Sequence, residues 1–328
     1  MQAIVNERYG NADVLQLKEV PKPAPKDDEV LIQVMATSLN SADWRFLTAD
    51  PFFIRFMNGL VRPKVTILGA DVAGVVVAAG PGAARFRIGD AVFGELGVGK
   101  FGGLAEYVRA PERLLVAKPD GMTFVEAAAL PMAGLTALQG LRDHGGIQAG
   151  QKVLIVGASG GVGSFAVQIA KVLGAEVTAV CSTSKMDQAR ALGATHVIDY
   201  TREDFTRNGQ QYDVIFVANG NRSLGEFERA LAPTGTLVIA GGGMRQLFQT
   251  LLLGPRKSRS GGKTYKNFTA HTSADDLAIL VDMVVAGEIK PPVDRSYPLA
   301  EAPEAMRYLG AGHAKGKVVV VVASKTRD

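Results

Sequence analysis

One stretch of the chain, residues 152–182, constrains the fold more than any other. It begins with an apolar, β-branched run, Val153 to Val156, of the kind found in strands buried on both faces. A glycine-rich turn follows, then apolar residues at helical spacing, and then a second apolar run from Glu176 to Cys181. This order predicts a βαβ unit, in which two parallel strands flank a helix.

The turn inside this unit has the composition of a dinucleotide-binding turn, with an alanine in place of the first glycine. Gly160 leaves room for the backbone to approach a pyrophosphate, and Gly163 lets the helix pack close to the strand. Amides at the start of the helix favour phosphate charge. The turn is therefore expected to bind a cofactor, and the alternative is a purely structural turn. The residues concerned are Ala158, Ser159, Gly160, Gly161, Val162 and Gly163.

Length and composition bound the class of protein. The 328 residues suggest two domains, and no apolar run is long enough to span a membrane. The single cysteine, Cys181, excludes an internal disulfide framework and a multi-cysteine zinc site. A net charge of +4 does not by itself argue for nucleic acid. The N-terminal residues show no signal or transit pattern, so a cytoplasmic location is expected.

The pattern of the chain changes near Thr123. Residues 1–122 contain many short apolar runs broken by glycine and proline, which predicts a partly closed β domain. Thr123 and Glu126 form a capping box ahead of an alanine-rich helix. Alternating strands and helices then predict an α/β fold with a doubly wound parallel sheet. Strands are expected at 153–157, 176–181, 195–199, 213–218, 235–241 and 267–273, and helices at about 163–173, 185–192 and 223–232.

The order of six short motifs resembles the medium-chain dehydrogenase/reductase superfamily, and most closely its zinc-free quinone oxidoreductase branch. The resemblance covers essentially the whole chain. It implies an NADP-binding Rossmann domain at 123–273 and a split, mostly β GroES-like catalytic domain at 1–122 and 274–328. The motifs are Gly69-Ala-Asp-Val-Ala-Gly-Val, Gly89-Asp-Ala-Val-Phe-Gly, Gly103-Leu-Ala-Glu-Tyr-Val, Ala127-Ala-Ala-Leu-Pro-Met-Ala-Gly-Leu-Thr-Ala, Gly157-Ala-Ser-Gly-Gly-Val-Gly and His313-Ala-Lys-Gly-Lys-Val-Val.

Zinc ligands are missing where the resemblance would place them. Zinc alcohol dehydrogenases of this superfamily carry a cysteine near Asn40, a Gly-His-Glu at 69–71 and another cysteine near Met132. This chain has an amide, a Gly-Ala-Asp and a thioether there. Zinc requires thiolate, imidazole or carboxylate, and neither the amide, the alanine methyl nor the thioether substitutes well. We therefore predict a zinc-independent protein without a metal site, in which Asp71 is a structural carboxylate.

The end of the second strand favours NADPH. NAD-specific members carry an acidic residue there, which bonds the ribose 2′-hydroxyl. This chain has Cys181 and Ser182, and the missing acid removes repulsion toward a 2′-phosphate. Ser182 can donate a hydrogen bond and Lys185 can supply a charge. Tyr200 resembles a tyrosine that packs on the adenosine phosphate side. The alternatives are a solvated lysine and a surface aromatic.

Three further residues are assigned to the cofactor site. Thr136 resembles a residue near the nicotinamide ribose, and its alternative is an ordinary helix threonine. Asn219 and Gly220 follow the fourth strand of the parallel sheet. Ligands bind at this carboxyl edge in doubly wound sheets.

Asn40 and Asp43 are the candidate catalytic residues. They lie in the segment Ser38 to Trp44, which the resemblance places against the nicotinamide. An amide can donate a hydrogen bond to a carbonyl oxygen on which negative charge develops. The alternatives are a turn role for Asn40 and a helix-capping role for Asp43.

Two stretches depart from a compact quinone reductase. Trp44 to Lys64 is rich in large apolar residues with interspersed arginines. Arg245 to Lys266 contains no acid and joins an apolar run to five basic residues, namely Arg256, Lys257, Arg259, Lys263 and Lys266. Core packing and a solvated basic loop explain them simply. The alternative is a lipophilic substrate mouth with weak peripheral contact to an anionic membrane.

These features together predict an NADPH-dependent oxidoreductase. It transfers hydride to a quinone or to the C=C bond of an α,β-unsaturated carbonyl, and acts as a monomer or homodimer on a lipophilic small molecule. No nucleic acid partner is expected. One alternative is a metal-free carbonyl reductase or alcohol dehydrogenase. Another is a cofactor-binding protein with little turnover.

Overall fold

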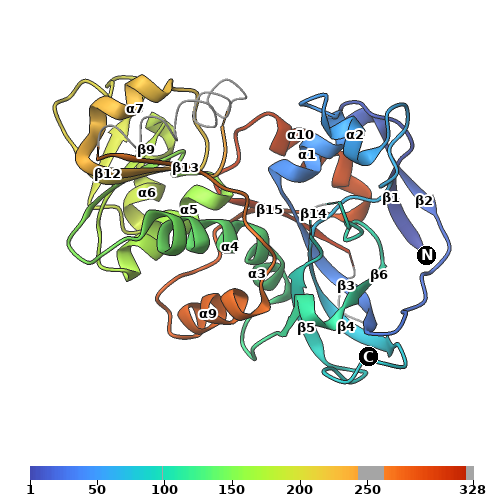
Figure 1. Cartoon of the computed structure of the whole chain (residues 1–328). Helices are drawn as coiled ribbons and strands as arrows, with labels where there is room; N and C mark the ends of the chain where they lie inside the picture. Colours follow the sequence, from blue (N-terminus) through green and yellow to red (C-terminus); the bar gives the residue numbers. More distant parts are fainter. Residues whose placement is uncertain (98, 243–261, 323–328) are drawn as a thin grey trace. The chain divides into compact units, whose positions relative to one another are not determined.

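The computed structural model describes residues 1–97, 99–242 and 262–322, and the chain divides into two compact units. Unit 1 comprises Met1–Met132, Thr272–Val285 and Pro291–Asp328, and unit 2 comprises Ala133–His271 and Ala286–Lys290. Figure 1 shows the elements of both units. None of the helices in the described ranges is long and apolar enough to cross a membrane.

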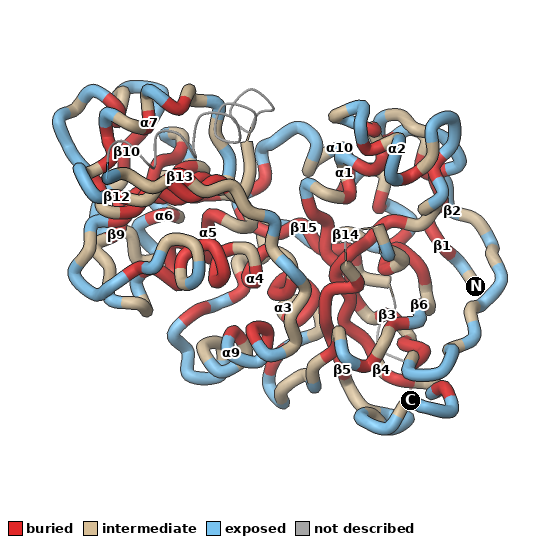
Figure 2. The backbone as a smooth tube through the Cα atoms, viewed as in Figure 1, coloured by how far each residue is buried: buried red, intermediate tan, exposed pale blue. Residues whose placement is uncertain are grey.

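Unit 1 is built on one seven-stranded sheet. Its long central strands are β3 (Glu29–Leu39) and β4 (Asp71–Ala79), which pair antiparallel and are buried along most of their length (Figure 2). The order is β14 (Val293–Pro298), β15 (Lys317–Val321), β3, β4, β5 (Ala91–Glu95) and β7 (Leu115–Ala117), and β6 (Tyr107–Pro111) also pairs with β3. The C-terminal strand β15 thus completes the N-terminal sheet, as expected for a split domain. A separate hairpin joins β1 (Gln2–Asn6) and β2 (Leu15–Glu19).

Helices pack against one another and against the strands of unit 1. Apolar side chains of α1 (Ser41–Thr48) and α10 (Ala302–Gly310) share one buried cluster with those of β15. The short helix α2 (Ile54–Asn58) adds Ile54 to the same cluster, and α9 (Ala274–Val285) contacts β7.

The unit boundary falls ten residues later than the expected boundary at 122/123. The expected helix is α3 (Phe124–Ala129), and its capping box is present: Thr123 N donates to Glu126 Oε2 at 3.0 Å. Its three C-terminal alanines are buried, and the helix packs on β3 and β4. Packing therefore assigns α3 to unit 1, although the sequence pattern placed it with the Rossmann domain.

Unit 2 holds the predicted doubly wound sheet. Its six strands are all parallel, and the order reverses direction between β8 and β11, the point at which such sheets bind ligands. The order is β10 (His196–Asp199), β9 (Glu176–Cys181), β8 (Lys152–Val156), β11 (Tyr212–Val217), β12 (Leu231–Ile239) and β13 (Thr264–Asn267). The helices are α4 (Pro131–Gln139), which begins at the unit boundary, α5 (Gly161–Val172), α6 (Met186–Ala191) and α7 (Leu224–Ala230).

The last strand of this sheet was predicted too late in the chain. We expected it at 267–273, but β13 ends at Asn267. Phe268 N still donates to Ile239 O at 3.2 Å, but by His271 the chain has left the ladder and exchanges hydrogen bonds with the side chain of Gln139. The pairing of Ile239 with Asn267 sets the register, which the apolar pattern alone did not reveal.

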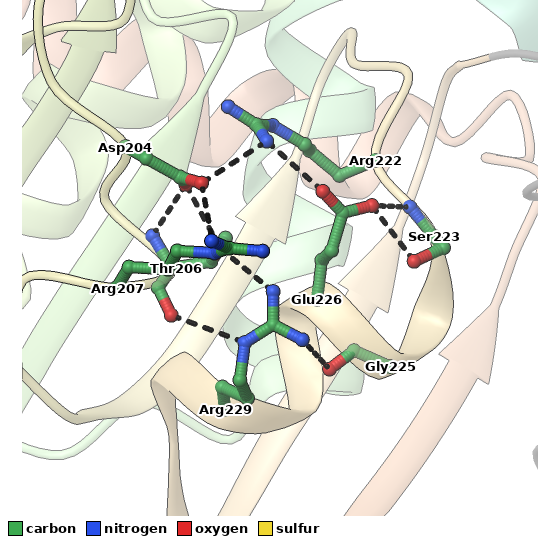
Figure 3. A network of polar contacts seen from close by, with 8 residues as sticks. All are labelled: Asp204, Thr206, Arg207, Arg222, Ser223, Gly225, Glu226 and Arg229. Carbon is green, nitrogen blue, oxygen red and sulfur yellow. Dashed lines mark hydrogen bonds and ion pairs between the residues drawn. The ribbon is translucent and has the colours of Figure 1, made fainter.

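A polar network fixes the turn that follows β11 (Figure 3). Arg222 reaches both Asp204, at 3.4 Å, and Glu226, at 2.9 Å. Glu226 also accepts from Ser223 N at 2.7 Å and so closes the cap of α7. Arg229 donates to the hydroxyl of Thr206 at 3.2 Å. The loop after β10 is therefore held to the start of α7, beside the carboxyl edge of the sheet.

Candidate functional site

The glycine turn of unit 2 has the geometry that a pyrophosphate requires. Gly160 is the N-cap of α5, whose first turn carries no acidic residue. A Cβ added at Gly160 would find no atom closer than 3.9 Å, whereas one added at Gly163 would lie 2.1 Å from the carbonyl oxygen of Gly157. The turn is therefore open at its tip and closely packed at its base. The residues present fit a dinucleotide phosphate at the helix N-terminus.

The ends of four strands meet around this turn. The amides of Gly157 and Ala158 donate to Val180 O at 3.2 and 3.1 Å, and Tyr200 N donates to Cys181 O at 3.1 Å. A Cβ at Gly157 would lie 2.6 Å from the carbonyl oxygen of Asn219. The carboxyl edge of the sheet thus brings together most of the predicted cofactor residues, namely Ala158 to Gly163, Ser182, Tyr200, Asn219 and Gly220, with Lys185 one turn beyond Ser182.

The predicted specificity residues surround a carboxylate that the sequence analysis missed. Asp199 ends β10 opposite Cys181, and it accepts from the hydroxyl of Thr183 and from Thr201 N at 3.0 Å. These hydrogen bonds, first that of Thr183 and then those of Thr201, hold the pKa of Asp199 below its ordinary value. Asp199 therefore stays ionised, and its ion-pair partner is the guanidinium of Arg202, whose Nε lies 3.7 Å from Oδ2.

The remaining residues of the predicted cofactor site differ in exposure. Ser182 and Lys185 are partly buried, and Tyr200 is exposed. Thr136 is partly buried within α4.

The basic stretch from Arg245 lies outside the described residues as far as residue 261.

Unit 1 holds a second polar cluster, which is centred on Asp71. This fully buried carboxylate opens β4. Its Oδ2 accepts from Ser38 Oγ at 2.7 Å and from Asn40 Nδ2 at 2.9 Å, and its Oδ1 accepts from Met132 N at 2.9 Å. Asp71 therefore joins the strand β3, the cap of α1 and the first turn of α4, which agrees with the structural role expected for it.

A buried lysine supplies the positive charge of this cluster. Lys317 is 2% exposed, and its Nζ lies 3.3 Å from Asp71 Oδ2 and donates to Asn40 Oδ1. The antiparallel pairing of β15 with β3 aligns Val318 with Leu39 and so brings Lys317 beside Asn40. The sequence analysis did not single out Lys317. The available signal was a lone lysine at the head of a very apolar strand, since lysine is almost never fully buried without a partner.

Asn40 is held at three points. Its oxygen accepts from Lys317, and its Nδ2 donates to Asp71 and, more weakly, to the carbonyl oxygen of Ser38 at 3.4 Å. A distance of 3.4 Å is at the long end for a hydrogen bond. The amide is therefore fixed in orientation, and one of its N–H groups is bound only weakly.

Asp43 is a capping residue rather than one exposed to a ligand. Its carboxylate is fully buried and accepts from Asn40 N at 2.7 Å and from Gly69 N at 2.8 Å. Burial raises the pKa of Asp43 to about 6, and these two hydrogen bonds oppose the rise. The structure thus favours the capping alternative, and Asp43 positions Asn40 through its backbone.

Glu95 is a third carboxylate in the cluster, also missed from the sequence. It is the last residue of β5 and pairs in register with Asp71. Burial, and after it the charge of Asp71, raise the pKa of Glu95 to about 7. Three carboxylates therefore share the neighbourhood of the Lys317 ammonium. Strand register brings them together, which no local motif indicates.

A zinc ion does not fit these residues. Asn40, Asp71 and Met132 stand at or beside the positions where the resemblance places zinc ligands. Asn40 and Met132 each contact Asp71, and the three residues offer one carboxylate and neither thiolate nor imidazole. That carboxylate already accepts several hydrogen bonds, and an ammonium lies against it. Across residues 1–97, 99–242 and 262–322, no three His, Cys, Asp or Glu side chains are grouped to hold a metal.

Comparisons with known proteins agree with this fold. The family description "Alcohol dehydrogenase GroES-like domain" matches residues 26–120, and "Zinc-binding dehydrogenase" matches residues 192–320. The chloroplast envelope quinone oxidoreductase homolog of Arabidopsis thaliana is 35% identical over 336 residues, covering 98% of each chain. The NADPH-dependent alkenal/one oxidoreductase of the same plant is 36% identical, covering 98% of this chain and 79% of that protein.

A solved structure is similar over the same extent. The quinone oxidoreductase from Coxiella burnetii superposes with a TM-score of 0.88 at 28% identity, covering 98% of this chain and 99% of that one. Fold, motif order and sequence identity along nearly the whole length therefore lead to one assignment. The chain is an oxidoreductase of the medium-chain dehydrogenase/reductase superfamily and belongs to its quinone oxidoreductase-like branch.

Proposed function

We propose that this oxidoreductase uses NADPH, without a zinc ion, to reduce quinones or the C=C bond of α,β-unsaturated carbonyls. The observation that carries the proposal is the buried Asp71–Lys317 pair beside Asn40. Asn40 and Asp71 stand at or beside the positions where the resemblance places zinc ligands. The printed names of the relatives, a quinone oxidoreductase homolog and an alkenal/one oxidoreductase, support the substrate class.

The reduced nicotinamide supplies the hydride, and the residues of unit 2 hold the cofactor. The glycine turn and the first amides of α5 bind the pyrophosphate. Ser182 and Lys185 bind the 2′-phosphate, and Arg202, 3.7 Å from Asp199, offsets part of the negative charge of that carboxylate. Tyr200 packs on the adenosine phosphate side. Thr136 lies near the nicotinamide ribose, and Asn219 and Gly220 border the cofactor at the edge of the sheet.

Asn40 is the proposed catalytic residue. Its weakly bound N–H, 3.4 Å from Ser38 O, can exchange that contact for the carbonyl oxygen of a substrate, while Asp71 and Lys317 keep the amide in place. Lys317 polarises the amide through its oxygen, so the hydrogen bond strengthens as negative charge grows on the substrate. Asp43 positions Asn40 by accepting its backbone amide.

The chemistry of one amide donor favours conjugated acceptors. Reduction of a simple ketone concentrates negative charge on one oxygen, and a metal ion is the usual means of stabilising it. A single donor of this kind contributes roughly 2.7–4 kcal/mol. This contribution is more nearly sufficient when the negative charge of the transition state spreads over the conjugated system of an enone or quinone. Carbonyl reduction, or cofactor binding with little turnover, are the rival functions.

A substrate panel tests this proposal. The purified protein, dialysed against a strong chelator and checked for zinc by elemental analysis, is assayed with quinones, enones and ketones using each reduced cofactor. We expect turnover of quinones or enones with NADPH at unchanged rates after dialysis. Stoichiometric zinc with activity lost on its removal would refute the metal-free part. Absence of turnover with the whole panel would favour a binding role.

The partners of the chain follow from the same proposal. A lipophilic small molecule is the substrate, and the protein works as a monomer or a homodimer in the cytoplasm. The proposal also includes weak peripheral contact of the chain with a membrane. Of the two stretches that suggested it, Trp44 to Lys64 lies wholly within the described residues.

A further inference from the structure

Unit 1 exposes a group of large apolar side chains on one short segment. Six such residues within ten positions are between 48% and 82% exposed: Phe52, Phe53, Phe56, Met57, Leu60 and Val61. The other exposed large hydrophobic residues of the described chain lie singly or as a pair on other elements. Contiguous apolar surface of this kind marks an interaction site.

The segment is fixed in shape rather than loosely attached. Ile54 and Asn58, on the inner side of α2, are buried, and Asn58 Oδ1 accepts from Val65 N at 2.9 Å. The guanidinium of Arg55 lies 4.6 Å from the ring centre of Tyr9 and donates to Leu60 O at 3.1 Å. The apolar side chains therefore stay outside although the backbone beneath them is well anchored.

The charges of the segment indicate its partner. From Pro51 to Lys64 the chain carries Arg55, Arg62 and Lys64 and no acidic residue, and both Arg62 and Lys64 are exposed. The nearby acids are Asp50, which precedes the segment, and Glu7, which pairs with Lys18 at 2.7 Å and interacts electrostatically with Arg62. Apolar side chains rimmed by cations match the headgroup boundary of an anionic bilayer.

A second copy of the chain is a poorer match for this surface. A two-fold interface brings the same patch of both copies together. Here it would bring Arg62 and Lys64 of one copy near those of the other, and like charges disfavour such pairing.

We propose that residues 51–64 form a docking surface for an anionic lipid bilayer. The aromatic and aliphatic side chains enter the headgroup boundary, while Arg62 and Lys64 contact lipid phosphates. The contact does not depend on the proposed reaction, because lipid alone is its ligand. A lipophilic acceptor held in the bilayer would then be presented to unit 1.

Vesicle sedimentation with the full chain tests the docking surface. The probes are vesicles of phosphatidylcholine, with and without phosphatidylglycerol, at rising salt. We expect binding to the anionic vesicles that is released by salt, as screening weakens the lysine and arginine contacts. The apolar variant F53S/F56S/V61S should lower the partition coefficient at least tenfold. R62Q/K64Q should lower it roughly 25-fold, at about fivefold for each cation.

Matched controls separate this surface from others. Ile88→Ser and Val285→Ser remove apolar side chains of similar exposure elsewhere in unit 1, and they should leave binding unchanged. Thermal melting verifies that each variant is folded. Binding that survives both variant sets would assign membrane contact to another part of the chain and overturn the proposal, as would absence of binding. A homodimer that dissociates in F53S/F56S/V61S would make a second copy the occupant instead.

Discussion

The glycine turn of unit 2 and the Asp71 cluster of unit 1 arrange polar groups in opposite ways. The turn uses backbone amides and empty space, and a Cβ at Gly163 would collide with Gly157 O at 2.1 Å. The cluster uses buried side chains that satisfy one another, with Lys317 balancing the charge of Asp71 and its neighbours. A larger side chain should therefore disrupt the turn, and removal of a charged group should destabilise the cluster.

Removal of the buried ammonium should have the largest effect. Lys317→Met leaves Asp71 without its cationic partner in a fully buried site, which costs about 3–5 kcal/mol in similar cases. We expect a clear loss in the melting temperature and in turnover. The double variant K317M/D71N should recover much of the stability, because the carboxylate nearest to the missing ammonium is then neutral. Lys315→Met, two residues away and exposed, is the control. Equal melting of both lysine variants would show that the pair is dispensable.

The pH dependence of stability should report on Glu95. Its pKa of about 7 lies above the ordinary 4.5, so the folded chain keeps a proton that the unfolded chain has lost between these values. The free energy of unfolding should therefore fall as pH rises through this window, by at most about 3 kcal/mol, and fall no further above it. Glu95→Gln has no carboxyl group to ionise at this position, so its free energy of unfolding should increase relative to that of the wild type as pH rises.

Melting at about pH 5 and about pH 8 measures this difference. Glu288→Gln, at an exposed position, is the matched control and should track the wild type. A gap between Glu95→Gln and the wild type that stays the same at both pH values would contradict the raised pKa.

Added volume in the turn should weaken cofactor binding. Gly163→Ala forces backbone atoms apart, at a cost of about 1–3 kcal/mol for overpacking, or roughly 5-fold to 150-fold in the dissociation constant of NADPH. Gly225→Ala places a methyl group in open space on α7 and should leave binding unchanged. Fluorescence titration measures both. Unaltered NADPH affinity in Gly163→Ala would show that the turn does not bind the cofactor.

The smallest effect is expected at the specificity residue. Lys185→Ala should lose about 1–2 kcal/mol of the preference for NADPH over NADH, the range for a partly exposed charge-assisted hydrogen bond. Arg190→Ala, which removes an exposed cation from the same region, is the control. An unchanged ratio of the two dissociation constants would leave Lys185 as an ordinary surface lysine.

The two sites also differ in how far the sequence predicts them. The turn lies within one βαβ unit, so glycine spacing and apolar periodicity locate it directly. Asn40 was found by resemblance, but its partner Lys317 is 277 positions away and reaches it through the register of β15 on β3. Glu95 likewise depends on strand register. Such pairings come from tertiary packing, and no local pattern records them.

The relative rates for a matched enone and ketone test the central claim most directly. Initial rates with NADPH are measured for cyclohexenone and cyclohexanone, using metal-free wild type and Asn40→Ala. We predict that kcat/KM for the enone exceeds that for the ketone at least tenfold. We also predict that Asn40→Ala lowers kcat for the enone by about 10²–10³, with a smaller change in KM. A ketone reduced as fast as the enone, or an Asn40→Ala variant altered in KM alone, would contradict the account.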